Sequence, residues 1–287
     1  MLGWLRHHRG VVPYLLLIPG GLWLVLFFVA PLLIMLSVSL QEGSLGRGYA
    51  LTWNFGIYPE AVAGAWTQIV RSLWYALVVT ILTLLIGYPA AYTIAFRGGR
   101  FKNILLLLVI LPFFTSFIIR TLSWKLILAD NGFLLGTLKE IGLLADNFRI
   151  IATPVSVIAG LTYNFLPFMI LPLYVALEKV DVRLVEAATD LYASRLQAFL
   201  RITLPLSIPG VFAGSLLTFI PAIGDFINAE ILGSRDTFMV GNVIQRAFLT
   251  SNDYPRAAAL SFALIAATMA IVLVYARVVG SERLTEG

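Results

Sequence analysis

Six stretches of this chain contain no Asp, Glu, Lys or Arg, and each is 17 to 32 residues long. A helix needs about 20 apolar residues, within a range of roughly 17–25, to cross the hydrocarbon core of a bilayer. Only 12% of the 287 residues are charged, about half of what a soluble domain carries. The stretches cover residues 10–41, 72–96, 103–119, 150–177, 202–224 and 257–276.

We therefore predict an all-α polytopic membrane protein with a single membrane domain, 11–279, between short tails at 1–10 and 280–287. Its six transmembrane helices are expected at about 11–40, 67–96, 103–125, 153–177, 205–232 and 257–279. The first stretch exceeds the hydrophobic region of a secretory signal, about 7–15 residues, and no A-x-A site follows it. A retained helix is thus favoured over a signal peptide. At the far end of the third stretch, we expect Arg120 to extend towards the lipid headgroups.

The basic residues predict the orientation, because short cytoplasmic connections are enriched in Lys and Arg. The connection between the second and third helices has three basic residues and no acid. We therefore place both termini and loop 178–204 in the cytoplasm, with the other three connections outside. This arrangement puts 11 of the 20 basic residues on the cytoplasmic side: Arg6, Arg9, Arg97, Arg100, Lys102, Lys179, Arg183, Arg195, Arg201, Arg277 and Arg283.

The residue inventory excludes several kinds of chemistry. There is no cysteine, and the two histidines, His7 and His8, stand in the N-terminal tail, so neither a thiolate site nor a membrane-embedded H-E-x-x-H zinc site is available. No lysine follows a glycine, which excludes the phosphate-binding loop G-x-x-x-x-G-K-[ST]. The scattered basic residues form no stripe for nucleic acid. We predict no catalytic residue, metal site or cofactor in this chain, so any energy from ATP must come through a partner.

Loop 178–204 is the most informative segment outside the predicted helices. Apolar residues recur at helical spacing among polar ones, which favours short amphipathic helices over a flexible linker. Ala187 and Ala188 are small enough to let a partner surface approach, and Glu186 presents a charge beside them. The alternative is an amphipathic segment that lies on the bilayer surface. Spacing alone leaves both interpretations open.

The same loop resembles the EAA loop of permease subunits of bacterial ABC importers, whose pattern is EAA-x3-G-x9-I-x-LP. The chain reads Glu186-Ala187-Ala188-x3-Tyr192-x9-Ile202-x-Leu204-Pro205. Further segments that match are YNFLPF at 163–168, GDF at 224–226, GN-x-IQ-x-x-F at 241–248 and NDYP at 252–255. Together they are most similar to the spermidine/putrescine permeases, specifically the first of the two permease subunits.

The resemblance implies a type I ABC importer permease fold in the bacterial inner membrane. It implies a coupling helix near 183–194 that seats in a groove of a homodimeric ATP-binding subunit, which holds the ATP and Mg. It also implies a second, related permease as heterodimer partner and an extracytoplasmic substrate-binding protein. The residues that the resemblance assigns to ATPase coupling are Arg183, Glu186, Ala187, Ala188, Asp190 and Tyr192.

Tyr192 departs from the family pattern, which has glycine at this position. Glycine tolerates positive φ, whereas an L-residue loses about 1–2 kcal/mol there. Either the turn adopts an ordinary helical conformation, or the partner groove has adapted to an aromatic ring.

A path for a multivalent cation needs acidic or π-rich groups to replace water. Asp225 and Glu230 lie near the Pro221–Gly224 break, about 140° apart on an ideal helix, so they share a face only if the break unwinds the chain. Asp225 either lines the path or forms a structural pair with an arginine or the backbone. Glu230 either lines the path or is a charge at the membrane interface. The other candidates are Tyr163, Phe165 and Trp124, through cation–π contacts, and Asn164, which needs a polar partner. The alternative for the aromatic residues is lipid-facing packing or an interfacial belt.

We expect an ATP-driven permease that alternates between inward-open and outward-open states and forms half of the path. Thiamine, an opine, iron or another small solute is the alternative cargo to a polyamine. An ion-driven secondary transporter is less favoured, because the spans have few carboxylates and the sequence shows no inverted repeat. A membrane enzyme would need a base and a nucleophile that the spans do not supply.

Overall fold

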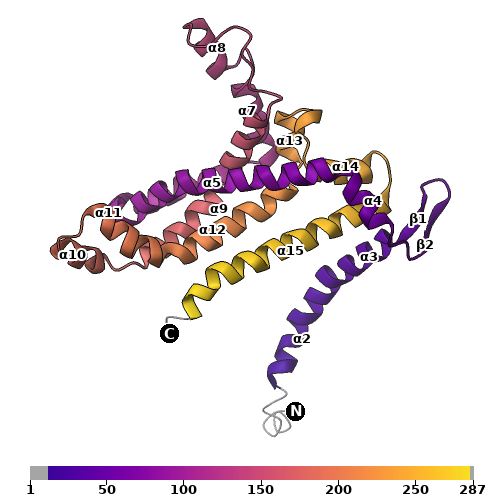
Figure 1. Cartoon of the computed structure of the whole chain (residues 1–287), viewed down its shortest axis with the longest axis horizontal. Helices are drawn as coiled ribbons and strands as arrows, with labels where there is room; N and C mark the ends of the chain where they lie inside the picture. The colour runs from indigo at the N-terminus through magenta and orange to yellow at the C-terminus, as the bar shows by residue number, and fades with distance from the viewer. Residues whose placement is uncertain (1–11, 285–287) are drawn as a thin grey trace. The chain divides into compact units, whose positions relative to one another are not determined.

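The computed structural model describes residues 12–284, and they are mostly helical (Figure 1). The predicted N-terminal tail, with Arg6, His7, His8 and Arg9, lies outside the described residues, as do the last three residues of the predicted C-terminal tail. The chain divides into two compact units, Met1–Gly64 with Ile244–Ala267, and Ala65–Val243 with Thr268–Gly287. Helices α14 (Val240–Leu249) and α15 (Tyr254–Leu284) contribute residues to both.

In the first unit, α2 (Val12–Leu24), the π-helical turn η1 (Val25–Val29) and α3 (Ala30–Ser39) follow one another directly. A hairpin comes next, in which β1 (Gln41–Ser44) pairs antiparallel with β2 (Gly48–Leu51). Gly48 has φ 79°, the left-handed conformation that commonly closes a three-residue hairpin loop. The Tyr49 hydroxyl donates to the carbonyl of Asn252, which ties the hairpin to the turn before α15. The helix α4 (Ile57–Gly64) completes this part.

The core of the second unit is formed by α5 (Trp66–Arg97), α9 (Pro154–Glu178) and α12 (Leu204–Gly224), which lie side by side (Figure 1). Two glycines of α12 permit a close approach to α9. A Cβ atom added at Gly210 would lie 2.8 Å from the Pro172 carbonyl oxygen, and one at Gly214 would lie 3.1 Å from that of Met169. Small residues at helix interfaces allow such packing in membranes. The buried apolar side chains here include Ala91, Ile94, Ile170, Leu173 and Leu177.

The third predicted span is broken. After the short turn η2 (Gly99–Phe101), it consists of α6 (Lys102–Ile110), η3 (Leu111–Phe114) and α7 (Phe117–Ile127), and the two halves are bent by 94°. Pro112 stands where α6 gives way to η3, since proline lacks an N–H and its ring clashes with the carbonyl four residues earlier, and the bend itself lies at residues 115 and 116. Thr115 is extended, with φ −101° and ψ 147°. The structure thus differs from the continuous helix expected over 103–125.

The fifth predicted span also ends early. Its helix α12 stops at Gly224, and after two residues the chain continues as α13 (Ile227–Leu232) and η5 (Arg235–Thr237). The short helix α8 (Phe133–Glu140) follows α7. Within residues 12–284, five helices are long and apolar enough to cross a membrane, and the bent pair is a sixth candidate. The predicted class, a helical multi-pass membrane protein, is confirmed, with the β1–β2 hairpin as a small addition.

Candidate functional site

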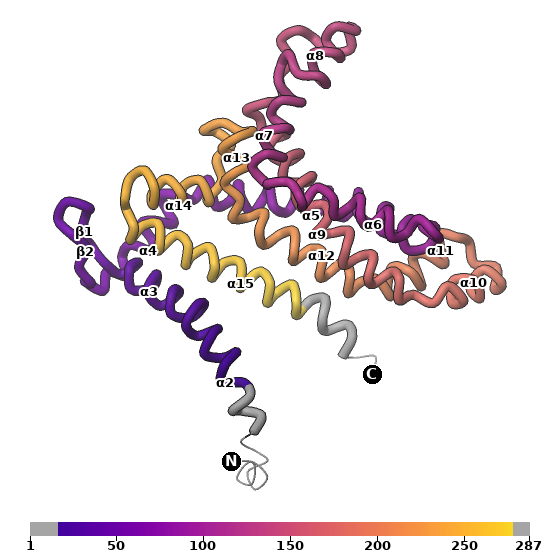
Figure 2. Tube along the Cα trace, turned by 180° about the vertical axis from the view of Figure 1, so that it is seen from behind, coloured from indigo at the N-terminus to yellow at the C-terminus, as the bar shows by residue number. Residues whose placement is uncertain are grey.

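Loop 178–204 is an ordered helical segment at the ends of α9 and α12 (Figure 2). It contains α10 (Val182–Asp190), α11 (Arg195–Ala198) and the π-helical turn η4 (Phe199–Thr203). The Asp181 carboxylate accepts from the Arg183 N–H at 2.9 Å, and Ser194 and Gln197 form a capping box. Such side-chain caps satisfy backbone donors that a helix start leaves free.

Most of the predicted coupling residues are exposed on α10 or just after it. Arg183, Glu186, Ala187 and Asp190 are exposed, and Ala188 is half-buried. Apolar side chains are exposed beside them: Val182, Leu184, Leu191 and Leu196. The segment therefore offers a mixed apolar and acidic surface that the described part of this chain leaves uncovered.

Tyr192 occupies the turn that ends α10. Its φ is 63°, its N–H donates to the Thr189 carbonyl at 3.0 Å, and the Ala193 N–H donates to the Ala188 carbonyl at 3.0 Å. These two bonds form a Schellman motif, in which the left-handed position is usually glycine. Of the two alternatives given for Tyr192, an ordinary helical turn is thus wrong, and an adapted partner groove stays a prediction. The side chain is 97% exposed.

A buried polar network joins α7, α9 and α13. The Asn164 amide Nδ2 lies 3.2 Å from Thr121 Oγ1 and 3.1 Å from Asn228 Oδ1, and Thr121 Oγ1 lies 3.3 Å from Asn228 Oδ1. All three side chains are at most 1% exposed. The polar partners that Asn164 requires are therefore Thr121 and Asn228, which come from segments 43 and 64 residues away.

The Asp225 carboxylate belongs to the same network. Its Oδ1 accepts from the Asn228 N–H at 2.8 Å, and its Oδ2 accepts from Asn228 Nδ2 at 3.2 Å. Asp225 is buried, whereas Glu230 is exposed and accepts from Asn242 Nδ2 at 3.0 Å. The break at 225–226 separates the two acids into different environments. Asn228 was not among the predicted site residues, because only packing brings it to Asn164 and Thr121.

Two of the predicted aromatic candidates, Tyr163 and Phe165 of α9, pack against α7, and the third, Trp124, is part of α7. The rings of Trp124 and Tyr163 lie 5.4 Å apart, edge to face, and those of Phe117 and Phe165 lie 6.5 Å apart. Arg120 does not extend towards the headgroups, because its side chain is only 9% exposed. Its guanidinium stands over the rings of Phe113 and Phe117, 5.1 and 5.6 Å from their centroids. These contacts gather aromatic and polar groups around α7.

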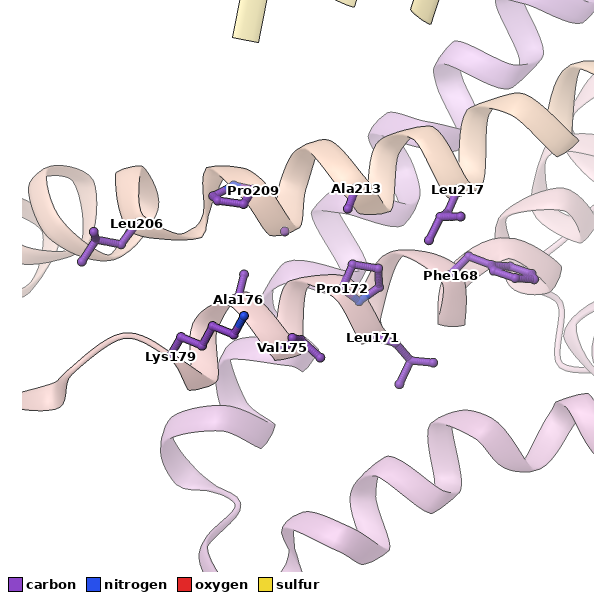
Figure 3. Close-up of a pocket in the computed structure, with 11 residues that line it drawn as sticks. Phe168, Leu171, Pro172, Val175, Ala176, Lys179, Leu206, Pro209, Ala213 and Leu217 are labelled. Atoms are coloured by element: carbon purple, nitrogen blue, oxygen red, sulfur yellow. The ribbon is translucent and has the colours of Figure 1, made fainter. Parts of the chain in front are cut away.

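An apolar groove of about 680 Å³ lies between α9 and α12 (Figure 3). Lys179 is the charged residue among its lining side chains, and Phe168 is its aromatic one. None of the predicted path residues lines it. A groove with this lining lacks the acidic groups that a polycation requires.

Comparison with known proteins identifies the class of this chain. The family model described as "Binding-protein-dependent transport system inner membrane component" matches residues 83–280. The spermidine/putrescine transport system permease protein PotB of Haemophilus influenzae is 41% identical over 256 residues, which cover 89% of this chain and 90% of that protein. PotB of Escherichia coli is 38% identical over 256 residues, which cover 89% and 93% of the two chains.

A solved structure shows the same fold. The bacterial alginate ABC transporter, crystallised in complex with an alginate pentasaccharide-bound periplasmic protein, contains a chain with a TM-score of 0.72 and 20% sequence identity. The match covers 98% of each chain. Fold and sequence thus define a multi-pass transport component of the inner membrane. The chain belongs to the binding-protein-dependent transport system inner membrane components, the permease subunits of ABC importers, and the resemblance drawn from its EAA loop is confirmed.

Proposed function

We propose that this permease carries polyamines, with spermidine and putrescine as its substrates. The observation that carries the proposal is the identity of 41% and 38%, over 89% of the chain, to two permeases named for spermidine and putrescine transport. The chain would form half of the path, beside a second, related permease. A homodimeric ATP-binding subunit would dock on loop 178–204, and an external binding protein would deliver the substrate.

The proposed orientation places loop 178–204 and both termini in the cytoplasm. An ion pair between Lys102 Nζ and Glu178 Oε1, at 2.5 Å, supports this placement. It brings the acid-free basic segment 97–102 to the same end of the helices as loop 178–204. Since short basic connections stay in the cytoplasm, the loop would stay there with them.

Asp225 is the proposed ligand for a substrate ammonium group. An ionised carboxylate has about four acceptor positions, and Asn228 occupies two of those on Asp225. Among the described residues no other group donates to them, so the remaining positions could accept from an ammonium group if the path opens beside α13. The aromatic rings of Tyr163, Phe165 and Trp124 would supply cation–π contacts of about 0.5–2 kcal/mol each, with Asn164 and Glu230 as polar contacts.

Uptake by the purified assembly in liposomes tests this function. Both permeases, the ATP-binding subunit and the binding protein are reconstituted, and ATP-dependent uptake of spermidine, putrescine, thiamine and a neutral sugar is compared. We expect ATP-dependent uptake of spermidine and putrescine, and no ATP-dependent uptake of thiamine or the neutral sugar. Asp225→Asn should lower polyamine uptake at least about tenfold while the assembly stays intact. Preferred uptake of thiamine or sugar would refute the polyamine assignment, and unchanged kinetics of the variant would refute the role of Asp225.

A further inference from the structure

Arg120 is a buried cation without a counter-ion in the described part of the chain. Its side chain is 9% exposed, and its Nε and Nη1 atoms have no hydrogen-bond partner among residues 12–284. Within that range, no carboxylate lies within 4 Å of its guanidinium. A charge in a membrane span usually faces a cavity or a partner. Here the guanidinium is stabilised by the two rings that it stands over, Phe113 and Phe117.

Phe113 and Phe117 belong to a closed group of four rings. The ring centroids lie 5.1 Å apart for Phe113 and Phe168, 6.1 Å for Phe168 and Phe165, and 6.5 Å for Phe165 and Phe117. We call Phe113, Phe117, Phe165 and Phe168 the phenylalanine cluster. Phe113 precedes the 94° bend and Phe117 follows it, so the bend sets how these two rings face the guanidinium.

The phenylalanine cluster has the chemistry of a site for an organic cation. Phenylalanine carries no hydrogen-bonding group in its side chain, and the faces of its ring are electron-rich. Such rings attract guanidinium and ammonium groups alike. Phe113 is 38% exposed, so a cation can approach the cluster at this ring. The cation that occupies the site in the structure is the chain's own Arg120.

The phenylalanine cluster adjoins the buried network that contains Asp225. Thr121 directly follows Arg120, and its Oγ1 lies 3.3 Å from Asn228 Oδ1. Asn228 in turn donates to both oxygens of the Asp225 carboxylate, at 2.8 and 3.2 Å. A cation site and an acidic group thus lie at the two ends of one short series of contacts between α7 and α13.

We propose that the phenylalanine cluster binds one ammonium group of the substrate and that Arg120 is a built-in competitor for this site. The entering ammonium group displaces the guanidinium from the rings, so that one cation–π contact replaces another. The return of Arg120 to the rings expels the ammonium group again. The competition keeps the affinity of the path low enough for release of the substrate. This inference rests on the proposed function and deepens it, because it assigns a second cation site beside Asp225 and a role to a basic residue.

Binding of putrescine to the permease tests this inference. The two permeases and the ATP-binding subunit are held together in lipid nanodiscs without ATP, and the Kd of radiolabelled putrescine is measured by equilibrium dialysis. Arg120→Gln removes the competing charge and should lower Kd by about two- to thirtyfold, the range to which one cation–π contact corresponds. Arg120→Lys keeps a cation at the rings, so its Kd should stay within about threefold of the wild-type value. An arginine that only stabilises the fold would instead give an unchanged or higher Kd for Arg120→Gln.

The contribution of the ring is measured with and without the competitor. In the wild type, Phe117→Leu weakens the contact of the ring with Arg120 and with the ammonium group alike, so Kd should change by less than about threefold. In Arg120→Gln only the ammonium contact is left, and Phe117→Leu should raise Kd by about threefold or more. Phe114 follows Phe113 in the chain and is 78% exposed, so Phe114→Leu is the matched control and should leave Kd unchanged in both backgrounds.

Two results would overturn the inference: an unchanged or higher Kd for Arg120→Gln, or an equal effect of Phe117→Leu in the two backgrounds. ATP-dependent uptake of spermidine, measured on the wild-type assembly with its binding protein, tests the proposed function separately. If uptake is normal and either result is found, the inference fails and the proposed function stands. If the wild type neither binds putrescine nor imports spermidine, both fail.

Discussion

Two buried threonines allow the polar network around Asn164 to be tested with isosteric changes. Thr121 is 0% exposed, and its hydroxyl donates to the Phe117 carbonyl at 3.0 Å and lies within 3.3 Å of Asn164 Nδ2 and Asn228 Oδ1. Thr218 is also 0% exposed, but its hydroxyl has no hydrogen-bond partner among the described residues. Replacing either with valine keeps the side-chain shape, so the comparison isolates the hydroxyl.

The expected magnitudes follow from what each hydroxyl contacts. Thr121→Val removes the acceptor for one Asn164 N–H, and interhelical hydrogen bonds in membranes contribute about 0.6 kcal/mol on average, up to about 1.7. A buried amide N–H left without a partner adds about 1 kcal/mol or more. We expect Thr121→Val to lower the free energy of unfolding by about 2 kcal/mol. Thr218→Val removes a buried hydroxyl that has no partner among the described residues. It should leave the free energy of unfolding unchanged or raise it by up to about 1 kcal/mol.

The free energy of unfolding is measured in mixed micelles of lipid-like detergent with increasing SDS, followed by tryptophan fluorescence. Each variant is compared with the wild type at equal protein-to-detergent ratio. We expect the free energies of unfolding of the two valine variants to differ by about 2–3 kcal/mol. Equal shifts, or a larger loss for Thr218→Val, would refute the network as described.

Two further predictions concern helix packing and docking. Gly210→Ala should lower the free energy of unfolding by about 1–3 kcal/mol, since its Cβ would lie 2.8 Å from the Pro172 carbonyl oxygen. Gly224→Ala is the matched control, because a Cβ there would meet no atom within 4 Å beyond its chain neighbours and its own helix backbone. Equal losses for the two variants would contradict the close α9–α12 contact. Glu186→Lys should abolish co-purification of the ATP-binding subunit while the permease still inserts, and normal co-purification with normal uptake would reject docking on α10.

The sequence predicts the candidate membrane spans and the short helices of loop 178–204, because both leave local signals. Charge-free runs mark the spans, and the EAA pattern marks α10 through residues close together in the chain. The break after α6 was missed although Pro112 signals it locally, since a proline in a span is often tolerated without a sharp bend. The partners of Asn164 were not predictable, because Thr121 and Asn228 meet it only through the packing of α7 and α13 against α9. The conformation of Tyr192 also required the structure, since an aromatic residue argues against positive φ.

We propose that loop 178–204 receives the motion of an ATP-binding subunit, and this role places the loop in the cytoplasm. The chain has no cysteine, so single cysteines report accessibility without further engineering. Leu191→Cys reports on the loop after α10, and Leu45→Cys reports on the hairpin; the two leucines are 81% and 65% exposed. In sealed right-side-out vesicles, a membrane-impermeant maleimide should label Leu45→Cys at once and Leu191→Cys only after permeabilisation. Immediate labelling of Leu191→Cys in sealed vesicles would place loop 178–204 outside the cell and refute its docking to an ATP-binding subunit.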